Sequence, residues 1–410
     1  MSDYTTNGKG RNPMVKKLQP KLRFRGFTDA WEPRRLKSLH RQPLLVSPVP
    51  SQTYISWSVP AFSTGEPEIV KGSEIESVKQ SVNSSDVLLC RINPRINRVW
   101  VVEARKDTDL PMIASTEWVV FTGHNSDSYF LSALFTSSRF RNMLLSEVAG
   151  VTGSQKRFQI ASVLERQEYF PTQIEQARIG LLFEKVDNLI AAEKRKLNLL
   201  QKKKTALLRQ IFGQKLRFKG YDNSWKPRRL GEIATVVGGG TPDTNNPLYW
   251  NGDINWFTPA EIGSNAYASK SERRITKEGL EHSSAKLLPA GRTILFTSRA
   301  SIGLTAILMA DACTNQGFQS LVVSDRTDMF FLFGLCNQIK KQAIRNAAGS
   351  TFIEISGKQL AKMPLQIPSL DEQRRIGKVV RTMDSLIAVA TRKIDLLKLK
   401  KKALLQQMFV

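Results

Sequence analysis

The chain is 410 residues long and carries 61 Lys and Arg against 36 Asp and Glu, a net charge of +25. Its hydrophobic content of 41% and charged content of 24% are those of a globular protein, which excludes a largely disordered chain. At about 150 residues per domain, the length predicts two to three domains. So large a positive excess indicates a polyanionic partner, with nucleic acid the first candidate and an anionic membrane the second.

Targeting and redox signals indicate the inside of the cell. Residues 1–25 are polar and basic without the apolar core of a secretory signal. No apolar run approaches the roughly 18 residues that a membrane span needs. The three cysteines are too few for a disulfide framework and lack metal-ligand spacing. We therefore expect a reduced, cytoplasmic protein that does not bind a membrane.

Two pairs of similar segments divide the chain into half-units. A leading repeat at residues 21–36 returns at 215–230 with ten of sixteen positions identical, and a trailing repeat at 171–212 returns at 368–409. Such self-similarity predicts two copies of one architecture, which we expect to be related by a pseudo-two-fold axis. The segments between the repeats, here called the bodies, are dissimilar. Residues 1–20 have no counterpart and are expected to be flexible.

The first body is predicted to be a mixed α/β domain. Apolar runs at residues 87–92, 98–103 and 118–121 predict strands, and residues 128–148 predict a helix. Residues 91–98 join the first two strands and contain three Arg and two Asn, which suit a hairpin that enters a DNA groove. A solvated hairpin tip is the alternative.

Candidate DNA-contacting residues of the first body fall in two groups. Those of the predicted hairpin are Arg91, Asn93, Arg95, Asn97 and Arg98. A Gly153–Ser154 turn is followed by Gln155, Lys156 and Arg157, and this basic group is predicted to hold a phosphate.

The trailing repeats are predicted to be long helices. Apolar residues recur at three- and four-residue steps, as on one helical face, and Thr172 with Glu175 and Ser369 with Glu372 predict capping boxes. Helices of about 35 to 40 residues with one apolar face need a partner, so we expect them to pair with each other as an intramolecular coiled coil. The candidate coiled-coil and partner-docking residues are Ile179, Val186, Leu189, Leu197, Leu200, Ile376, Met383, Leu386, Ile394 and Leu397. The basic helix ends suit DNA phosphates or an acidic partner, or else a solvated surface.

The second body repeats the order of elements without repeating the sequence. Strands are predicted at residues 293–297, 303–309 and 319–323, and a helix at 328–348, followed by a Gly349–Ser350 turn. Polar residues of these loops are suited to base readout, although residues 315–318 also fit turn chemistry. The candidates are Thr241, Thr297, Ser298, Arg299, Ser301, Asn315, Gln316 and Gln319.

Motifs of catalysis are missing from the sequence. The glycines at residues 238–240 precede no Lys-Ser/Thr pair of a phosphate loop, and no amino-methyltransferase tetrad is present. The three histidines lack metal-like neighbours. We therefore expect a DNA-binding protein without an active site, metal or cofactor of its own. The alternatives are a methyltransferase or nuclease with a divergent site, and a coiled-coil adaptor for acidic proteins.

The sequence resembles the specificity (S) subunits of type I restriction-modification enzymes. The resemblance is carried by two duplicated motifs, Lys-Leu-Arg-Phe-x-Gly…Trp and Glu-Gln-x-x-Ile-Gly…Asp-x-Leu-Ile, and by the two dissimilar bodies. The resemblance covers residues 21–409. It implies target recognition domains at residues 21–170 and 214–367, and conserved long helices at 171–213 and 368–410. The implied fold is mixed α/β, with the two domains joined by an antiparallel coiled coil.

In that family each recognition domain recognises one half of a bipartite, asymmetric site in double-stranded DNA. The coiled coil sets the spacer and docks two modification (M) subunits, which carry S-adenosylmethionine and methylate adenine N6. Restriction (R) subunits join for cleavage and use ATP and Mg. The resemblance thus implies a non-catalytic recognition subunit.

Overall fold

The computed structural model describes residues 19–104, 107–149, 156–263, 265–347 and 353–409. Residues 1–18 of the predicted extension and the two predicted Gly-Ser turns lie outside the described residues. The chain forms two units. The first contains the chain up to Arg195 together with the residues from Arg392 onward, and the second contains Lys196–Thr391. Each unit therefore holds one body and a part of both long helices.

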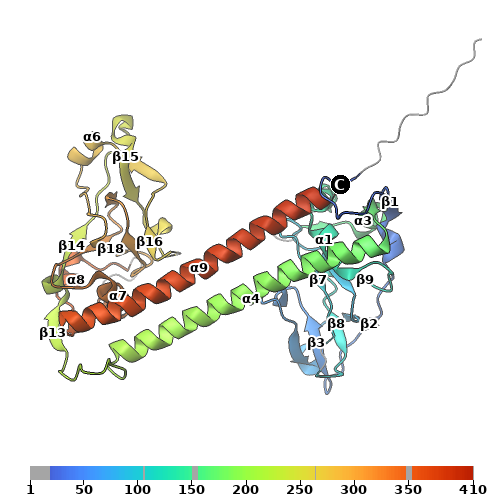
Figure 1. Ribbon diagram of the computed structural model, residues 1–410, viewed down its shortest axis with the longest axis horizontal. Helices are drawn as coiled ribbons and strands as arrows, with labels where there is room; N and C mark the ends of the chain where they lie inside the picture. The colour runs from blue at the N-terminus through green and yellow to red at the C-terminus, as the bar shows by residue number, and fades with distance from the viewer. Residues whose placement is uncertain (1–18, 105–106, 150–155, 264, 348–352, 410) are drawn as a thin grey trace, which may run out of the picture. The chain divides into compact units, whose positions relative to one another are not determined.

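The first body is built on two small sheets and three short helices. One sheet has the order β2-β5-β8-β3-β4, with bounds Leu45–Val46, Lys79–Ser81, Met112–Ala114, Thr53–Trp57 and Glu68–Lys71. The other has the order β7-β6-β9, with bounds Val99–Val101, Val87–Cys90 and Trp118–Phe121. Two-stranded pairs join β1 (Glu32–Arg35) to β12 (Gln167–Phe170), and β10 (Val148–Ala149) to β11 (Arg157–Phe158). The helices are α1 (Ser128–Thr136), α2 (Ser138–Ser146) and α3 (Ile160–Glu165), and α1 packs on β6 and β7 (Figure 1).

The second body has a related plan. Its larger sheet has the order β14-β21-β18-β19-β16, with bounds Ala234–Gly238, Gln319–Val323, Thr293–Phe296, Thr305–Leu308 and Tyr267–Ala268. A smaller sheet has the order β17-β15-β20, with bounds Arg273–Ile275, Trp250–Phe257 and Ala312–Thr314, and β13 (Lys226–Arg229) pairs with β22 (Pro364–Ile367). The helices are α5 (Leu230–Ile233), α6 (Lys277–Glu281), α7 (Met329–Asn346) and α8 (Gly357–Ala361), and α7 packs on β18 and β19.

The predicted elements are largely present, with one difference in the first body. The predicted helix at residues 128–148 is two helices, α1 and α2. Ser137 breaks it, because its backbone is extended (φ −59°, ψ 150°) and its hydroxyl caps α2 by accepting the Phe140 N–H at 3.2 Å. The equivalent α7 is unbroken over its 18 residues.

The long helices α4 (Gln173–Phe212) and α9 (Leu370–Met408) run antiparallel within the first unit. There Lys401 bonds Asp187 at 2.6 Å, and Lys393 bonds Glu193 at 2.5 Å. In the second unit, Lys204 bonds Asp384 at 2.5 Å. Each of these pairs places a charged residue of one helix against an opposite charge on the other helix. The mixed α/β fold with two long helices confirms the predicted fold class.

Both bodies attach to the helices through the same buried ion pair. Arg23 of the leading repeat donates to both oxygens of Glu175 at 2.7 Å, and Glu175 is fully buried. The second unit repeats this contact between Arg217 and Glu372, at 3.0 and 2.8 Å. The predicted capping boxes are therefore only half formed. Thr172 accepts the Glu175 N–H at 3.4 Å, but the carboxylate is bonded to the arginine.

The rest of the Glu-Gln-x-x-Ile-Gly motif holds the first helix of each body. Gln176 accepts the Asp127 N–H at 3.3 Å, and Asp127 caps α1. A Cβ at Gly180 would lie 2.0 Å from the Asp127 carboxylate, so only glycine allows this approach. In the second unit, a Cβ at Gly377 would lie the same distance from Asp328.

Aromatic side chains complete each core at the end of the other long helix. In the first unit Phe409 lies 6.1 Å from Trp31 and 5.8 Å from Phe130, measured between ring centroids. In the second unit Phe212 lies 6.4 Å from Trp225 and 5.6 Å from Phe331. Each body thus needs the last turn of a helix whose first turn serves the other body. Among the described residues, no helix is both long enough and apolar enough to cross a bilayer.

Candidate nucleic-acid interface

The loop between β6 and β7 is tied to the segment that begins at Lys156. Asn93 has a left-handed backbone (φ 48°), which Asn tolerates better than most residues, and its N–H donates to the Lys156 carbonyl at 2.7 Å. The Ile96 N–H donates to the Asn93 carbonyl at 3.0 Å and closes the turn. The two groups predicted to contact DNA in the first body therefore lie together.

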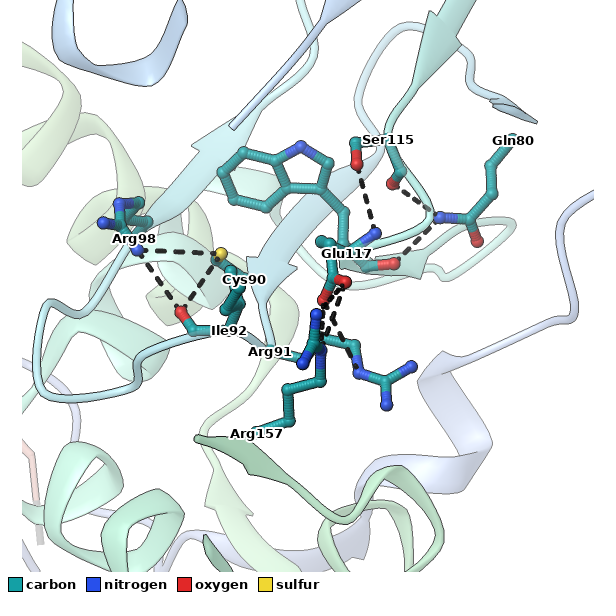
Figure 2. Close-up of polar contacts among 9 residues, drawn as sticks. Gln80, Cys90, Arg91, Ile92, Arg98, Ser115, Glu117 and Arg157 are labelled. Carbon is teal, nitrogen blue, oxygen red and sulfur yellow. Dashed lines mark hydrogen bonds and ion pairs between the residues drawn. The ribbon is translucent and has the colours of Figure 1, made fainter. Parts of the chain in front are cut away.

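Two of the predicted residues of this hairpin bond within the body. The Asn97 amide donates to the Phe135 carbonyl at 2.7 Å. The Arg98 guanidinium donates to the Ile92 carbonyl at 3.3 Å and lies 3.9 Å from the Cys90 sulfur, as Figure 2 shows. Both side chains hold the hairpin on the sheet and on α1.

A glutamate that was not among the predicted site residues lies between two predicted arginines (Figure 2). The Arg157 Nη2 lies 2.7 Å from Glu117 Oε1, and its Nε donates to the same carboxylate at 3.0 and 3.1 Å. The Arg91 Nε lies 3.9 Å from Glu117 Oε2, beyond hydrogen-bond distance. The bond from Arg157 lowers the pKa of Glu117, against the opposing effect of burial, and the same bond raises the pKa of Arg157.

The loop that carries Glu117 is fixed by the strands around it. Gln80 donates to the carbonyls of Ser115 and Trp118, both at 2.9 Å, and the Ser115 hydroxyl accepts the Glu117 N–H at 3.3 Å (Figure 2). The Arg91 N–H donates to the Glu117 carbonyl at 2.9 Å. A single acid before a strand in a basic body is a weak sequence signal, because nothing local shows that an arginine 40 residues away will meet it.

Arg95 and Lys156 have different exposures. The Arg95 side chain is exposed near the hairpin tip, while its carbonyl accepts from the Arg141 guanidinium at 2.6 Å. Lys156 is half-buried. Arg95 is therefore the most accessible of the predicted arginines of this body.

The second body contains an open cleft of about 510 Å³ at the loops that follow β18 and β20. Pro259, Ala260, Ile262 and Leu304 form its apolar wall. The polar part and the floor consist of Arg299, Ala300, Ser301, Asn315, Gln316 and Gly317. The structure thus brings together four of the residues that the sequence predicts for base readout.

Thr297 and Ser298 are fully buried beneath this cleft. The Thr297 hydroxyl accepts the Leu304 N–H at 2.9 Å and lies 2.5 Å from the Ser301 carbonyl. The Ser298 N–H donates to the Gly317 carbonyl at 2.7 Å. These two residues hold the loops of the cleft together and have no surface to offer a ligand.

The other predicted residues of the second body make local contacts. Arg299 lies 2.8 Å from Glu354, with side chains 52% and 41% exposed. The Thr241 hydroxyl donates to Gln316 at 2.6 Å, which fixes the orientation of that exposed amide. The Asn315 side chain accepts the Gly317 N–H at 2.9 Å, a turn contact. Gln319 is half-buried at the start of β21.

The predicted helix residues differ in burial. Ile179, Ile376 and Ile394 are buried. Half-buried positions are Val186, Leu197, Leu200, Met383 and Leu397. Leu189 and Leu386, at equivalent positions of the two repeats, are 51% and 46% exposed. Further exposed apolar residues of the helices are Leu181, Leu199, Val389, Leu396 and Leu399.

Reactive groups are few in the described part of the chain. No three or more His, Cys, Asp or Glu among the described residues are grouped to hold a metal ion. The three cysteines are buried, and burial raises the thiol pKa of Cys313 to about 11 and of Cys336 to about 12. Thiols with such pKa values are protonated near neutral pH and are poor nucleophiles.

Sequence comparisons relate the second half-unit to a known family. Residues 223–399 match the family model of the type I restriction modification DNA specificity domain. The specificity subunit of the type I restriction enzyme MjaIX from Methanocaldococcus jannaschii is 36% identical over 167 residues, which are 40% of this chain and 38% of that protein. The EcoR124I/EcoR124II specificity subunit from Escherichia coli is 30% identical over 218 residues, or 52% of each chain. Each match therefore spans about half of the relative or less.

Solved structures share the fold over nearly the full length. The S subunit of a type I restriction-modification system from M. genitalium superposes with a TM-score of 0.62 at 14% identity, over 96% of this chain and 99% of the other. A chain from a structure on the assembly and conformational transition of a type I system gives a TM-score of 0.52 at 20% identity, over 92% and 97%. At these identities the likeness concerns the fold.

Proposed function

Because residues 223–399 match the type I restriction modification DNA specificity domain and two specificity subunits are 30% and 36% identical over parts of the chain, we propose that the chain belongs to this family. We infer that it is the non-catalytic DNA-recognition subunit of such a complex. Each body recognises one half of a bipartite, asymmetric site in double-stranded DNA. The coiled coil sets the spacer between the halves. The complex acts on DNA in the cytoplasm.

The repeated attachment of two dissimilar bodies carries this proposal. The Arg23–Glu175 and Arg217–Glu372 contacts present both bodies on one scaffold, while the loops that face outward differ. A duplicated scaffold with different loops is what recognition of two different half-sites requires. If the loops bound one shared ligand, their sequences would have no reason to diverge while the attachment stays the same.

The proposed DNA contacts are the accessible residues of each body. In the first body these are Arg95 and Lys156 with the Arg91–Arg157 pair. In the second they line the cleft, where Gln316 and Asn315 suit base edges, Arg299 and Ser301 suit phosphate or base, and the apolar wall suits a thymine methyl. Thr297 and Ser298 act beneath the cleft.

The proposed protein partners are two modification subunits on the long helices, joined by restriction subunits. The exposed leucines of α4 and α9 support this, because apolar side chains such as Leu189 and Leu386 are left without cover by the chain itself. S-adenosylmethionine is expected on the modification subunits, and ATP and Mg on the restriction subunits.

Methylated-base sequencing tests the proposal. We expect a strain that expresses this chain with its modification subunit to carry N6-methyladenine at a motif split into two specified halves by an unspecified spacer. The matched control carries the same modification subunit with this chain deleted, and its DNA should lack the signal. Methylation at a single unsplit motif contradicts the proposal.

Calorimetry on the full-length chain alone separates a recognition subunit from a divergent methyltransferase. The chain is expected to release no heat with S-adenosylmethionine. Binding of S-adenosylmethionine by this chain in the absence of a modification subunit would favour the enzyme.

A further inference from the structure

We propose that Glu117 is a positioning residue that determines the specificity of the first body. Its carboxylate holds Arg157 in a fixed plane and Arg91 nearby, and so limits the attraction of both arginines to DNA of any sequence. This inference rests on the proposed function and deepens it for one half-site.

The geometry places the carboxylate where two arginines would otherwise lie side by side. Arg157 bonds it through Nε and Nη2 at 2.7 to 3.1 Å, and Arg91 approaches within 3.9 Å (Figure 2). All three side chains keep contact with solvent, at 37% exposure for Arg157, 33% for Arg91 and 29% for Glu117. The group is accessible to DNA and is no part of the buried core.

The charge of the group is the reason why the carboxylate affects specificity. Two arginines alone would present two positive charges, and phosphates are available to them along every DNA sequence. Glu117 cancels one of the charges, which weakens binding to DNA in general. A base edge binds hydrogen-bond donors more tightly when they are held in the matching orientation. An Arg157 guanidinium that the carboxylate already holds loses less conformational freedom when it binds a base edge. The carboxylate therefore disfavours phosphate contacts more than base contacts.

A purely structural role for the pair is disfavoured by the backbone around it. Backbone contacts already join the hairpin to the segment that carries Arg157. The Asn93 N–H donates to the Lys156 carbonyl at 2.7 Å, the Phe158 N–H donates to the Arg91 carbonyl at 3.3 Å, and a β-bridge joins Ile92 to Arg157. The fold of this corner thus has bonds that do not depend on the side chain of Glu117.

The second body also sets an acid against an arginine, but its acid comes from the segment after the helix, which supplies Arg157 in the first body. A β-bridge joins Arg299 to Glu354 just after β18, as the bridge from Ile92 to Arg157 lies just after β6. The Arg299 and Glu354 side chains are 2.8 Å apart at the edge of the cleft. Both bodies therefore place an acid against an arginine that the sequence predicts to contact DNA, although the sequences around them differ.

The test measures how well each half-site is discriminated. The full-length chain with its modification subunits is titrated with labelled duplexes that carry the bipartite site intact, altered in the first half, altered in the second half, or replaced by random sequence. For Glu117→Gln, we expect first-half discrimination to fall by about fivefold or more. Affinity for random duplex should rise, and the log–log salt slope should steepen by about 0.9 for one more phosphate contact. Second-half discrimination should stay unchanged.

Two further variants make the result specific. Glu165→Gln removes the same charge from an exposed carboxylate that bonds Arg35 and Lys37, and it should leave both discriminations unchanged. Arg157→Lys keeps the charge and loses the bidentate contact, so it should lower discrimination of the first half. If Glu117→Gln does not fold, Arg157→Lys provides a second test of the contact between Arg157 and Glu117.

Outcomes that count against the two proposals differ. A wild-type complex that discriminates neither half-site overturns the proposed function. Two results overturn only the role of Glu117 when the wild-type complex discriminates both half-sites. In one, Glu117→Gln and Arg157→Lys leave first-half discrimination unchanged. In the other, they lower discrimination of both half-sites equally.

Discussion

Arg95 has the geometry of a residue that contacts a ligand, whereas Asn97 and Arg98 of the same hairpin do not. Its side chain is exposed, and the hairpin beneath it is held by Arg141, by Asn97 and by Arg98. A residue that is free at the tip of a fixed loop loses little conformational freedom elsewhere when it binds a base edge. Arg95 is thus the strongest candidate for direct readout in the first body.

Replacing Arg95 with alanine tests this directly. If Arg95 makes a bidentate guanine contact, Arg95→Ala should lose about 1–3 kcal/mol of discrimination at one base pair of one half-site. Selection from randomised duplexes, with and without the substitution, measures it. Arg98→Ala is the control, since Arg98 bonds inward and its loss should lower stability before specificity. If Arg95→Ala leaves the base preference unchanged, a residue other than Arg95 makes the base contact.

At the scale of elements, the trailing repeat combines several contacts in six residues. Glu175 bonds Arg23 of the leading repeat, and Ile179 is buried in the core. Gln176 and Gly180 contact Asp127, the residue that caps α1. A helix that serves only as a spacer needs an apolar stripe and no such motif. Each long helix is therefore also the base on which one body is mounted.

Removing the buried ion pair should destabilise the first unit strongly. Glu175→Ala leaves Arg23 largely buried without its carboxylate, which typically costs about 3–5 kcal/mol. Urea unfolding, followed by tryptophan fluorescence, gives the change in the free energy of unfolding. Glu165→Ala removes an exposed carboxylate of the same body and should cost about 1 kcal/mol or less. Equal effects of the two substitutions would show that the Glu175 contact adds little.

At the scale of the whole molecule, the plan separates the loops proposed to recognise DNA from the contacts that attach each body to the helices. The strand pair β13–β22 and the Arg217–Glu372 contact lie outside residues 231–348, so these parts of the attachment stay the same when this stretch of the second body differs. The same division holds in the first body, where β1 pairs with β12 and Arg23 with Glu175.

Exchange of the second body should change one half-site only. A chimera in which residues 231–348 come from another specificity subunit is expected to direct methylation to a motif with a new second half, an unchanged first half and an unchanged spacer. Methylated-base sequencing of strains with the parent and the chimera measures this. A change in both halves would refute the independence of the two bodies.

The sequence by itself determined the repeated plan, the two long helices, three of the strands in each body and the absence of familiar catalytic motifs. These are local or repetitive signals. Such signals can be recognised without knowledge of the tertiary contacts. Examples are a 3.6-residue apolar period, a duplicated sixteen-residue segment and a missing phosphate loop. The break at Ser137 was missed because a serine inside an apolar helical pattern is compatible with both one helix and two.

Tertiary structure alone decided which polar residues are available to a ligand. Arg98, Asn97 and Thr297 have the chemistry of base readout, but their side chains bond within the protein. Ser298 has that chemistry too, but it is fully buried. Glu117 lacks that chemistry, yet it lies among the arginines. The physical reason is that availability depends on partners far along the chain, which folding selects through the packing of whole elements. Residue type fixes what a side chain can bind, and the fold determines whether that capacity is already used.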